Sequence, residues 1–147
     1  MYILVLNQFM DKTIITVSTR VEAGIGQVWS CFTEPVHIMQ WNQASPDWHC
    51  PASTNDLRPG GKFSSTMAAK DGSFSFDFWG IYDEVDTHKK IAYTLGDGRK
   101  ADVLFQDNGN STAITVHFEP ESQNSLELQQ AGWQAILDSY KKYTEGS

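Results

Sequence analysis

Tight-turn signals at four places do most to restrict what this chain can fold into. These signals are Gly60-Gly61, Asp71-Gly72, Gly96-Asp97-Gly98 and Asn108-Gly109. Glycine, asparagine and aspartate in such short runs favour the turns that connect antiparallel strands. The sequence therefore predicts an antiparallel meander of six strands, over residues 51–58, 62–69, 74–85, 89–95, 100–106 and 111–119.

Helical patterns stand on both sides of this meander. A β-branched run predicts a first strand over 13–21, and apolar spacing predicts short helices over 25–33 and 35–41. A long helix over 125–144 follows the last strand, with apolar residues at helical spacing: Leu126, Trp133, Ile136, Leu137 and Tyr140. The order β-α-α-β6-α, with about seven strands, predicts an α+β domain in which a curved antiparallel sheet packs against the long helix.

Aromatic residues gather on one face of the predicted sheet. The chain holds 8 Phe, 5 Tyr and 5 Trp, and successive side chains of a strand point to opposite faces. In the strand from residue 74 onward, one face therefore carries Phe74, Phe76, Phe78 and Tyr82, and the other carries Ser73, Ser75 and Asp77. Gly80, on the aromatic face, leaves room for a neighbouring element. Such a face fills a core or lines a cavity for an apolar ligand.

The charge balance argues against two classes of partner. The chain has 11 basic and 18 acidic residues, a net charge of −7, and its basic residues are scattered. Nucleic-acid binding needs a concentrated basic patch, and anionic membranes attract the same feature. We therefore expect no nucleic-acid partner and no membrane partner.

The N-terminal apolar run and the two cysteines indicate where in the cell the protein resides. Residues 2–6 are apolar but too few to span a bilayer. They also lack the preceding basic region and the following small-residue cleavage site of a signal peptide. Cys31 and Cys50 form no C-x-x-C pair and are expected to be reduced thiols. These features predict a cytoplasmic protein.

One glycine pair imitates a cofactor motif. Gly24-Ile25-Gly26 follows a predicted strand and opens a predicted helix. The third glycine of a dinucleotide fingerprint is missing, because residue 29 is Trp, and no βαβ unit follows. We therefore predict a flexible helix start and no cofactor.

The histidines and cysteines do not form a metal motif. His49 and Cys50 are adjacent in extended chain, so their side chains point to opposite faces, whereas zinc needs three or four converging ligands. Cys31 and His37 stand elsewhere in the sequence, and Cys31 suits a small core position. We predict no metal site. A Cys–His nucleophilic pair is an alternative, although nothing in the sequence orients a third group.

Several segments, taken together, resemble one known family. They are Val28-Trp29, Thr33-Glu34-Pro35, Trp41, Asp47-Trp48-His49-Cys50-Pro51, Asp56-Leu57-Arg58-Pro59-Gly60-Gly61-Lys62-Phe63, Gly72-Ser73-Phe74 through Gly80, and Ala131-Gly132-Trp133. Over residues 11–144 the chain resembles the START-like SRPBCC superfamily. Within it, the chain is similar to the group named after the C-terminal domain of the heat-shock-chaperone ATPase activators, whose bacterial members are often labelled polyketide-cyclase-like. One departure is Ala23-Gly24, where the family usually has Ala-Pro.

The resemblance implies a helix-grip fold with an internal cavity between the sheet and the long C-terminal helix. Members of the superfamily hold lipids, sterols, polyketides or other hydrophobic molecules in that cavity. Because members commonly begin near the position of Met10, we expect residues 1–9 to be an N-terminal extension and residues 10–147 to be one START-like domain.

Seven residues are candidates for contact with a ligand in this cavity: Trp41, Trp48, Arg58, Phe76, Phe78, Tyr93 and Trp133. Each has a plain structural alternative. The tryptophans can pack in the core, and the Tyr93 hydroxyl can serve a cavity or the ring can simply pack. Arg58 can pair with Asp56 at the surface instead of binding a ligand carboxylate through its planar fork.

The leading hypothesis is a binding module for a small hydrophobic or aromatic molecule. An alternative is a cyclase or aromatase-type enzyme, which needs two or more polar groups from His49, Arg58, Asp77 and Tyr93 to converge in the cavity; no catalytic constellation is identifiable from the sequence. A second alternative is an interaction domain with a chaperone partner. In eukaryotic activators, however, stimulation of the ATPase depends on an additional N-terminal domain, for which this chain has no space.

Overall fold

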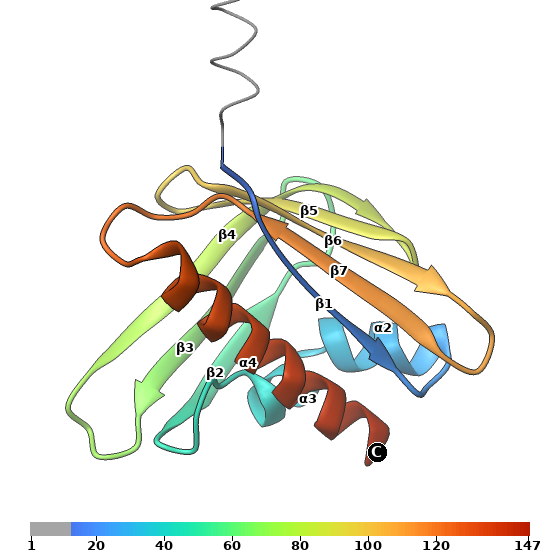
Figure 1. Cartoon of the computed structure of the whole chain (residues 1–147), viewed down its shortest axis with the longest axis horizontal. Coiled ribbons are helices and arrows are strands. Elements are labelled where there is room, and N and C mark those ends of the chain that lie inside the picture. Colours follow the sequence, from blue (N-terminus) through green and yellow to red (C-terminus); the bar gives the residue numbers. More distant parts are fainter. Residues whose placement is uncertain (1–12) are drawn as a thin grey trace, which may run out of the picture.

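The computed structural model describes residues 13–147 and shows one curved sheet with three helices (Figure 1). The predicted extension over residues 1–9 lies outside the described residues. In chain order the elements are β1 (Ile15–Val21), α2 (Ile25–Thr33), α3 (Pro35–Trp41), β2 (Trp48–Asn55), β3 (Lys62–Ala69), β4 (Ser75–Asp86), β5 (Lys90–Leu95), β6 (Lys100–Asp107), β7 (Thr112–Phe118) and α4 (Leu126–Glu145). The predicted α+β helix-grip architecture is confirmed.

The seven strands form a single antiparallel sheet in the order β1-β7-β6-β5-β4-β3-β2. Four of the five hairpins in the meander from β2 to β7 lie at the predicted turns, and the hairpin between β4 and β5 turns at His88, which has a positive φ of 68°. β1 pairs with β7. The register aligns branched apolar residues in a row across the sheet, in which Val17 faces Val116, Val116 faces Val103 and Val103 faces Ile91. This row forms the centre of the concave inner face.

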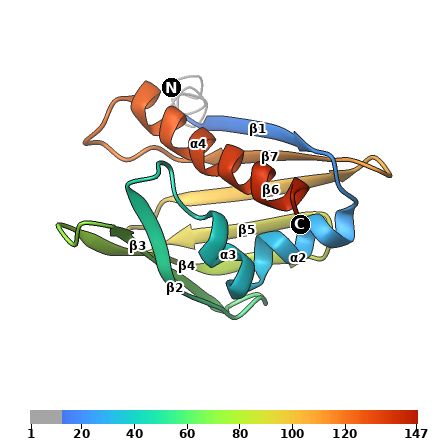
Figure 2. The ribbon, with the colours of Figure 1, turned by 90° about the horizontal axis from the view of Figure 1, so that it is seen from below.

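All three helices lie on that same face of the sheet (Figure 2). The long helix α4 packs against β1, and α3 packs against β2. The Ser125 hydroxyl caps α4 by accepting a hydrogen bond from the Leu128 amide at 3.1 Å, which satisfies an amide that the helix itself leaves unpaired. Pro35 begins α3, where its fixed φ suits the first helical turn.

Buried hydrogen bonds tie the helices together beneath their apolar contacts. Tyr140 of α4 is fully buried, and its hydroxyl donates to the Val28 carbonyl of α2 at 2.6 Å. The Trp41 indole N–H of α3 donates to the Cys31 carbonyl of α2 at 2.7 Å. Because both polar groups are paired inside the core, their burial carries no unsatisfied hydrogen bond.

The predicted boundaries of the second strand need correction. β2 runs from Trp48 to Asn55 instead of over 51–58, because pairing with β3 already begins where Trp48 faces Ala69. The register then shifts between His49 and Ala52. Pro51 lies within this bulge, where its lack of an amide hydrogen does not cost the sheet a hydrogen bond.

The expectation that Phe74 helps to fill the core or line the cavity is wrong. Phe74 precedes β4, and its side chain is 59% exposed. The β3–β4 hairpin ends beyond the stretch of sheet that α4 covers (Figure 1). The alternation predicted for this strand therefore holds, but its first aromatic residue extends past the helix and meets solvent.

Candidate ligand-binding cavity

A cavity of about 270 Å³ lies between the inner face of the sheet and the helices. The row Val17, Val116, Val103 and Ile91 supplies its floor. α4 supplies Trp133, Ile136 and Leu137, and the short helices supply Phe32, Ile38 and Trp41. The cavity therefore sits where every layer of the fold presents its apolar side.

Aromatic rings form much of the remaining wall. The Phe63 ring centroid lies 4.9 Å from that of Tyr93 and 5.2 Å from that of Tyr82. A Cβ atom on Gly80 would come within 2.8 Å of the Phe63 ring. The absence of a side chain at Gly80 thus gives Phe63 its position, in agreement with the close approach predicted there.

Most polar groups of the cavity wall are already paired with protein atoms. The Tyr82 hydroxyl donates to Asn55 Oδ1 at 2.6 Å, and Asn55 Nδ2 donates to the Thr33 carbonyl at 2.6 Å. The hydroxyls of Ser53 and Ser65 lie 3.1 Å apart. These bonds join β2, β3 and β4 to the end of α2, so they fix the wall on its polar side.

The cavity is electrically neutral. Among the described residues that line it, none is Asp, Glu, Lys, Arg or His. Its two ionisable groups are tyrosines, and burial raises the pKa of Tyr82 to about 12. Burial, together with the neighbouring Tyr82, also raises the pKa of Tyr93. Both hydroxyls therefore stay protonated and uncharged at neutral pH.

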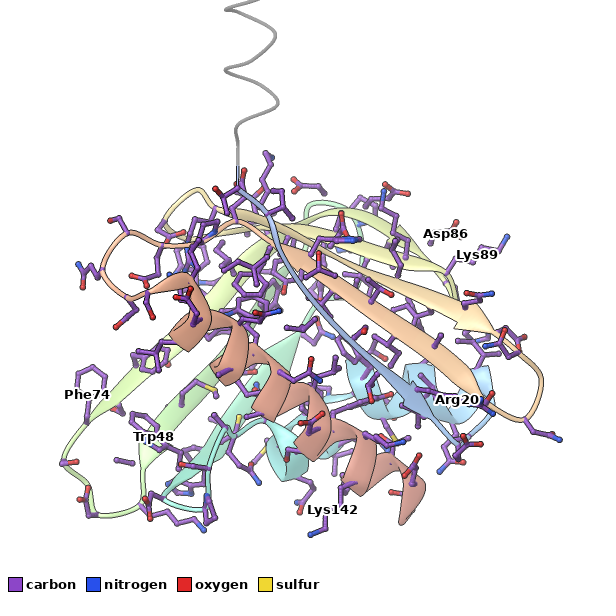
Figure 3. The ribbon with its side chains drawn as sticks, in the orientation of Figure 1. Arg20, Trp48, Phe74, Asp86, Lys89 and Lys142 are labelled. Carbon is purple, nitrogen blue, oxygen red and sulfur yellow. The ribbon has the colours of Figure 1, made fainter. Side chains whose placement is uncertain are left out.

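An exposed aromatic cluster stands at the edge of the cavity. It consists of Trp48, Phe74 and Phe76, and the labelled side chains of Trp48 and Phe74 lie at the same end of the sheet (Figure 3). The ring centroids of Trp48 lie 6.2 Å from those of both phenylalanines, which are 6.0 Å from each other. Phe76 also lines the cavity, so it links the cluster to the interior.

Comparison with known proteins agrees with this architecture. The sequence profile of the family "Activator of Hsp90 ATPase homolog 1-like protein" matches residues 22–145. The chain belongs to this family. The resemblance stated from the sequence is thereby confirmed.

Solved structures of similar proteins share the fold of this family member over most of its length. A solution structure of Chr148 from Cytophaga hutchinsonii is 57% identical, with a TM-score of 0.78, and the match covers 90% of this chain and 92% of that one. An AHSA1-like protein from Aeromonas hydrophila is 40% identical, with a TM-score of 0.86 and coverage of 91% and 93%. CalU16 from Micromonospora echinospora, at 19% identity and a TM-score of 0.65, covers 89% of this chain and 75% of its own and shares the fold. Among curated proteins, none matches the chain.

Five of the seven candidate ligand-binding residues of this family member line the cavity. They are Trp41, Phe76, Phe78, Tyr93 and Trp133. Trp48 belongs instead to the exposed aromatic cluster, because β2 begins there and carries it to the sheet edge. Arg58 lies beyond the end of β2, with its side chain 74% exposed and its Nε 3.0 Å from both Asp56 carboxylate oxygens. The surface alternative holds for Arg58.

The four polar residues named for the cyclase or aromatase alternative do not converge. Of the four candidates, only Tyr93 lines the cavity. His49 and Arg58 are exposed, and Asp77 is exposed on the outer face, where it accepts a hydrogen bond from the Thr66 hydroxyl at 2.9 Å. The arrangement required by the cyclase or aromatase alternative is therefore not formed by these residues.

The cysteines and histidines also remain apart. Within residues 13–147, no group of three His, Cys, Asp or Glu side chains is placed to hold a metal ion. Both thiols are buried, and burial raises the pKa of Cys31 and of Cys50, which disfavours a nucleophilic thiolate. The Cys50 thiol donates to the Ala52 carbonyl at 3.4 Å, and His37 Nδ1 lies 2.7 Å from the Tyr143 hydroxyl. Neither interaction joins a cysteine to a histidine.

Sequence reasoning missed a polar pair on the outer face of the sheet. His117 Nδ1 lies 2.8 Å from Asp102 Oδ1, in a shallow depression that also contains Lys100. The pairing could have been predicted, because residues at equal distances before and after the turn at Asn108-Gly109 face each other in the hairpin. This count places Asp102 opposite His117. Both side chains are partly exposed, so the pair contributes roughly 0–1 kcal/mol to stability.

The Asn55 network was missed as well. Asn55 is far in sequence from Thr33 and Tyr82, and only the path of the chain after α3 brings the three together. Among the helices within residues 13–147, none has the length and apolar character needed to span a membrane.

Proposed function

We propose that this protein binds a small hydrophobic or aromatic molecule in the cavity between the sheet and α4. The observation that carries the proposal is the cavity itself, about 270 Å³ in volume and walled by aromatic and aliphatic side chains. Transfer of an apolar ligand from water into such a space is favourable. A dry cavity of roughly 150 Å³ holds benzene, so this one suits a ligand of about two fused rings.

The proposal also includes a cytoplasmic location and a small molecule as the partner. The net charge of −7 and the scattered basic residues support the absence of a nucleic-acid or anionic membrane partner. The neutral cavity supports a ligand held by apolar contact more than by ion pairing.

The test is a titration of tryptophan fluorescence with a naphthalene-sized ketone, 2-acetonaphthone. Trp41 and Trp133 line the cavity, so we expect saturable quenching as the ligand comes to lie beside them. A saturation curve with a dissociation constant in the micromolar range supports the proposal, and no saturable change at any soluble concentration contradicts it.

Two neighbouring residues offer a matched pair of variants for this test. Val103 and Leu104 are adjacent in β6, but Val103 lines the cavity and Leu104 is exposed on the outer face. Val103→Phe fills the cavity and should abolish the quenching, whereas Leu104→Phe should leave it unchanged. Equal loss in both variants would show that the ligand does not enter the cavity.

A further inference from the structure

Tyr93 is the one deeply placed hydroxyl of the cavity wall that no protein group engages. Its side chain is only 9% exposed and lines the cavity. It lies on the inner face of β5 with Ile91 and Leu95. Among residues 13–147, the hydroxyl has no hydrogen-bond partner, and the single described side-chain atom that is both enclosed and unpaired belongs to Thr144. The Tyr93 hydroxyl is therefore not completely enclosed by protein atoms.

The neighbouring polar groups are not available in the same way. Tyr82, directly opposite Tyr93 across the two strands, donates its hydroxyl hydrogen bond to Asn55 Oδ1. The Trp41 indole N–H donates a hydrogen bond to the Cys31 carbonyl, and the Thr33 hydroxyl donates one to the Trp29 carbonyl at 2.8 Å. The Tyr93 hydroxyl has a donor that no protein group uses, so it is the position where a ligand oxygen would gain most.

The charges around the cavity restrict the ligand further. No acidic or basic residue of the described chain lines it, so a charged ligand would lose its hydration without gaining a counter-ion. The overall charge of −7 adds to the disadvantage of an anion. A neutral ligand with an oxygen that accepts a hydrogen bond avoids both costs.

We infer that the cavity selects uncharged aromatic molecules that carry a carbonyl, ether or hydroxyl oxygen, and that the Tyr93 hydroxyl donates a hydrogen bond to that oxygen. This inference rests on the proposed function and names its ligand class. Tyr93 acts here as a specificity-determining residue: it adds affinity for the oxygen, while the apolar wall binds the ring system.

Three probes of equal size separate the contributions. 2-Acetonaphthone carries a neutral acceptor, 2-isopropylnaphthalene carries none, and 2-naphthoate carries a negative charge on the same ring system. Their dissociation constants are measured with the wild-type protein by tryptophan fluorescence. We expect the ketone to bind about fivefold to tenfold more tightly than the hydrocarbon, as one neutral hydrogen bond predicts, and the carboxylate to bind most weakly.

The Tyr93→Phe variant then removes the hydroxyl and keeps the ring. Its affinity for the ketone should fall to that of the hydrocarbon, while its affinity for the hydrocarbon stays the same or rises. Tyr140→Phe is the matched control, because its buried hydroxyl donates to Val28 and Tyr140 does not line the cavity. The preference of this control for the ketone should equal that of the wild type.

The other possible results of these titrations each contradict one specific claim. If all three probes bind and Tyr93→Phe keeps the preference for the ketone, the role of Tyr93 is wrong and the proposed function stands. If 2-naphthoate binds most tightly, selection of uncharged ligands is wrong. If none of the probes binds, the proposed function fails and this inference fails with it.

Discussion

Trp133 of α4 stacks on Phe118 of β7, with ring centroids 3.8 Å apart and planes 9° from parallel. Trp133 also meets Phe78 of β4, with centroids 5.9 Å apart and planes 78° from parallel. One side chain of the long helix thus reaches aromatic residues on two strands that are not neighbours in the sheet. Since Trp133 and Phe78 both line the cavity, this contact holds the helix over the concave face and closes part of the wall.

Replacing Trp133 by alanine should destabilise the fold. The change removes the stack with Phe118 and the contact with Phe78, and large-to-small changes of aromatic residues in a core cost about 3 kcal/mol or more. Urea unfolding should show this loss as a lower midpoint. Phe74→Ala serves as the control, because Phe74 is largely exposed, and its loss should stay below about 1 kcal/mol. Equal losses would contradict the structural role of Trp133.

Replacing Gly80 by alanine should also destabilise the protein. The cause is the lack of space for the added methyl group, and not the backbone conformation of Gly80. The added Cβ atom would lie 2.7 Å from the Thr94 carbonyl oxygen and 2.8 Å from the Phe63 ring. The ring can move, but the carbonyl belongs to the paired strand. We expect a loss of about 1–3 kcal/mol in the free energy of unfolding, as for other overpacked sites.

Gly132→Ala is the matched control for this substitution and should act in the opposite direction. Gly132 lies within α4, and an added Cβ atom would meet nothing within 4 Å. Alanine is favoured over glycine in helices by about 0.5–1 kcal/mol. A gain for Gly132→Ala with a loss for Gly80→Ala supports the packing described here; the same sign for both would contradict it.

The Tyr82–Asn55 hydrogen bond should appear as an energetic coupling. Tyr82→Phe leaves Asn55 Oδ1 without its donor, at a cost of about 1–2 kcal/mol. In the Asn55→Ala background, the same change at Tyr82 should cost clearly less. A double-mutant cycle from denaturant unfolding measures the difference, and additive effects of the two substitutions would show that the bond contributes nothing.

Turn chemistry made most of the fold predictable from the sequence. The glycine-containing turns set every hairpin of the meander except the one between β4 and β5, and the apolar spacing of Trp133, Leu137 and Tyr140 set the buried side of α4. The beginning of β2 was not predictable in this way. Its first pairs lie before a bulge at Pro51, and sequence rules read proline as the edge of a strand.

For the candidate site, the sequence predicted only which strand side chains point to the inner face. Strand alternation places Phe78 and Tyr82 on the inner face, but it does not say where the covering helix stops, and so it did not predict that Phe74 is exposed. Nor does local sequence report which hydroxyls find partners. Tyr82 and Tyr93 face each other in the sheet, and only the position of Asn55, brought in from β2, makes one of them paired and the other not.

Alkaline pH should weaken the fold through its buried tyrosines. Burial raises the pKa of Tyr82 from 10.0 to about 12. Below pH 10 this hydroxyl is protonated in both states, so its contribution is constant. Between about pH 10 and 12 the unfolded chain releases the proton while the folded protein keeps it, so the free energy of unfolding falls by up to about 1.4 kcal/mol per pH unit.

Comparison with Tyr82→Phe isolates this effect from other titrating groups. Urea unfolding of both proteins at pH 9, 10 and 11 gives their difference in stability at each pH. We expect the advantage of the wild type to shrink as the pH rises above 10, because only the wild type carries this hydroxyl. A constant difference across the series would show that Tyr82 is not shielded from water in the folded protein.

The central claim is that a small neutral ligand enters the space between the sheet and α4, and the tryptophan indole N–H resonances test it most directly. Trp41 and Trp133 line the cavity, whereas Trp79 is exposed on the outer face beneath Lys62. In a ¹H–¹⁵N titration with 2-acetonaphthone, we expect saturable shifts of the Trp41 and Trp133 indole signals and an unchanged Trp79 signal. Shifts confined to Trp79, or no saturable shift at Trp41 and Trp133, would contradict it.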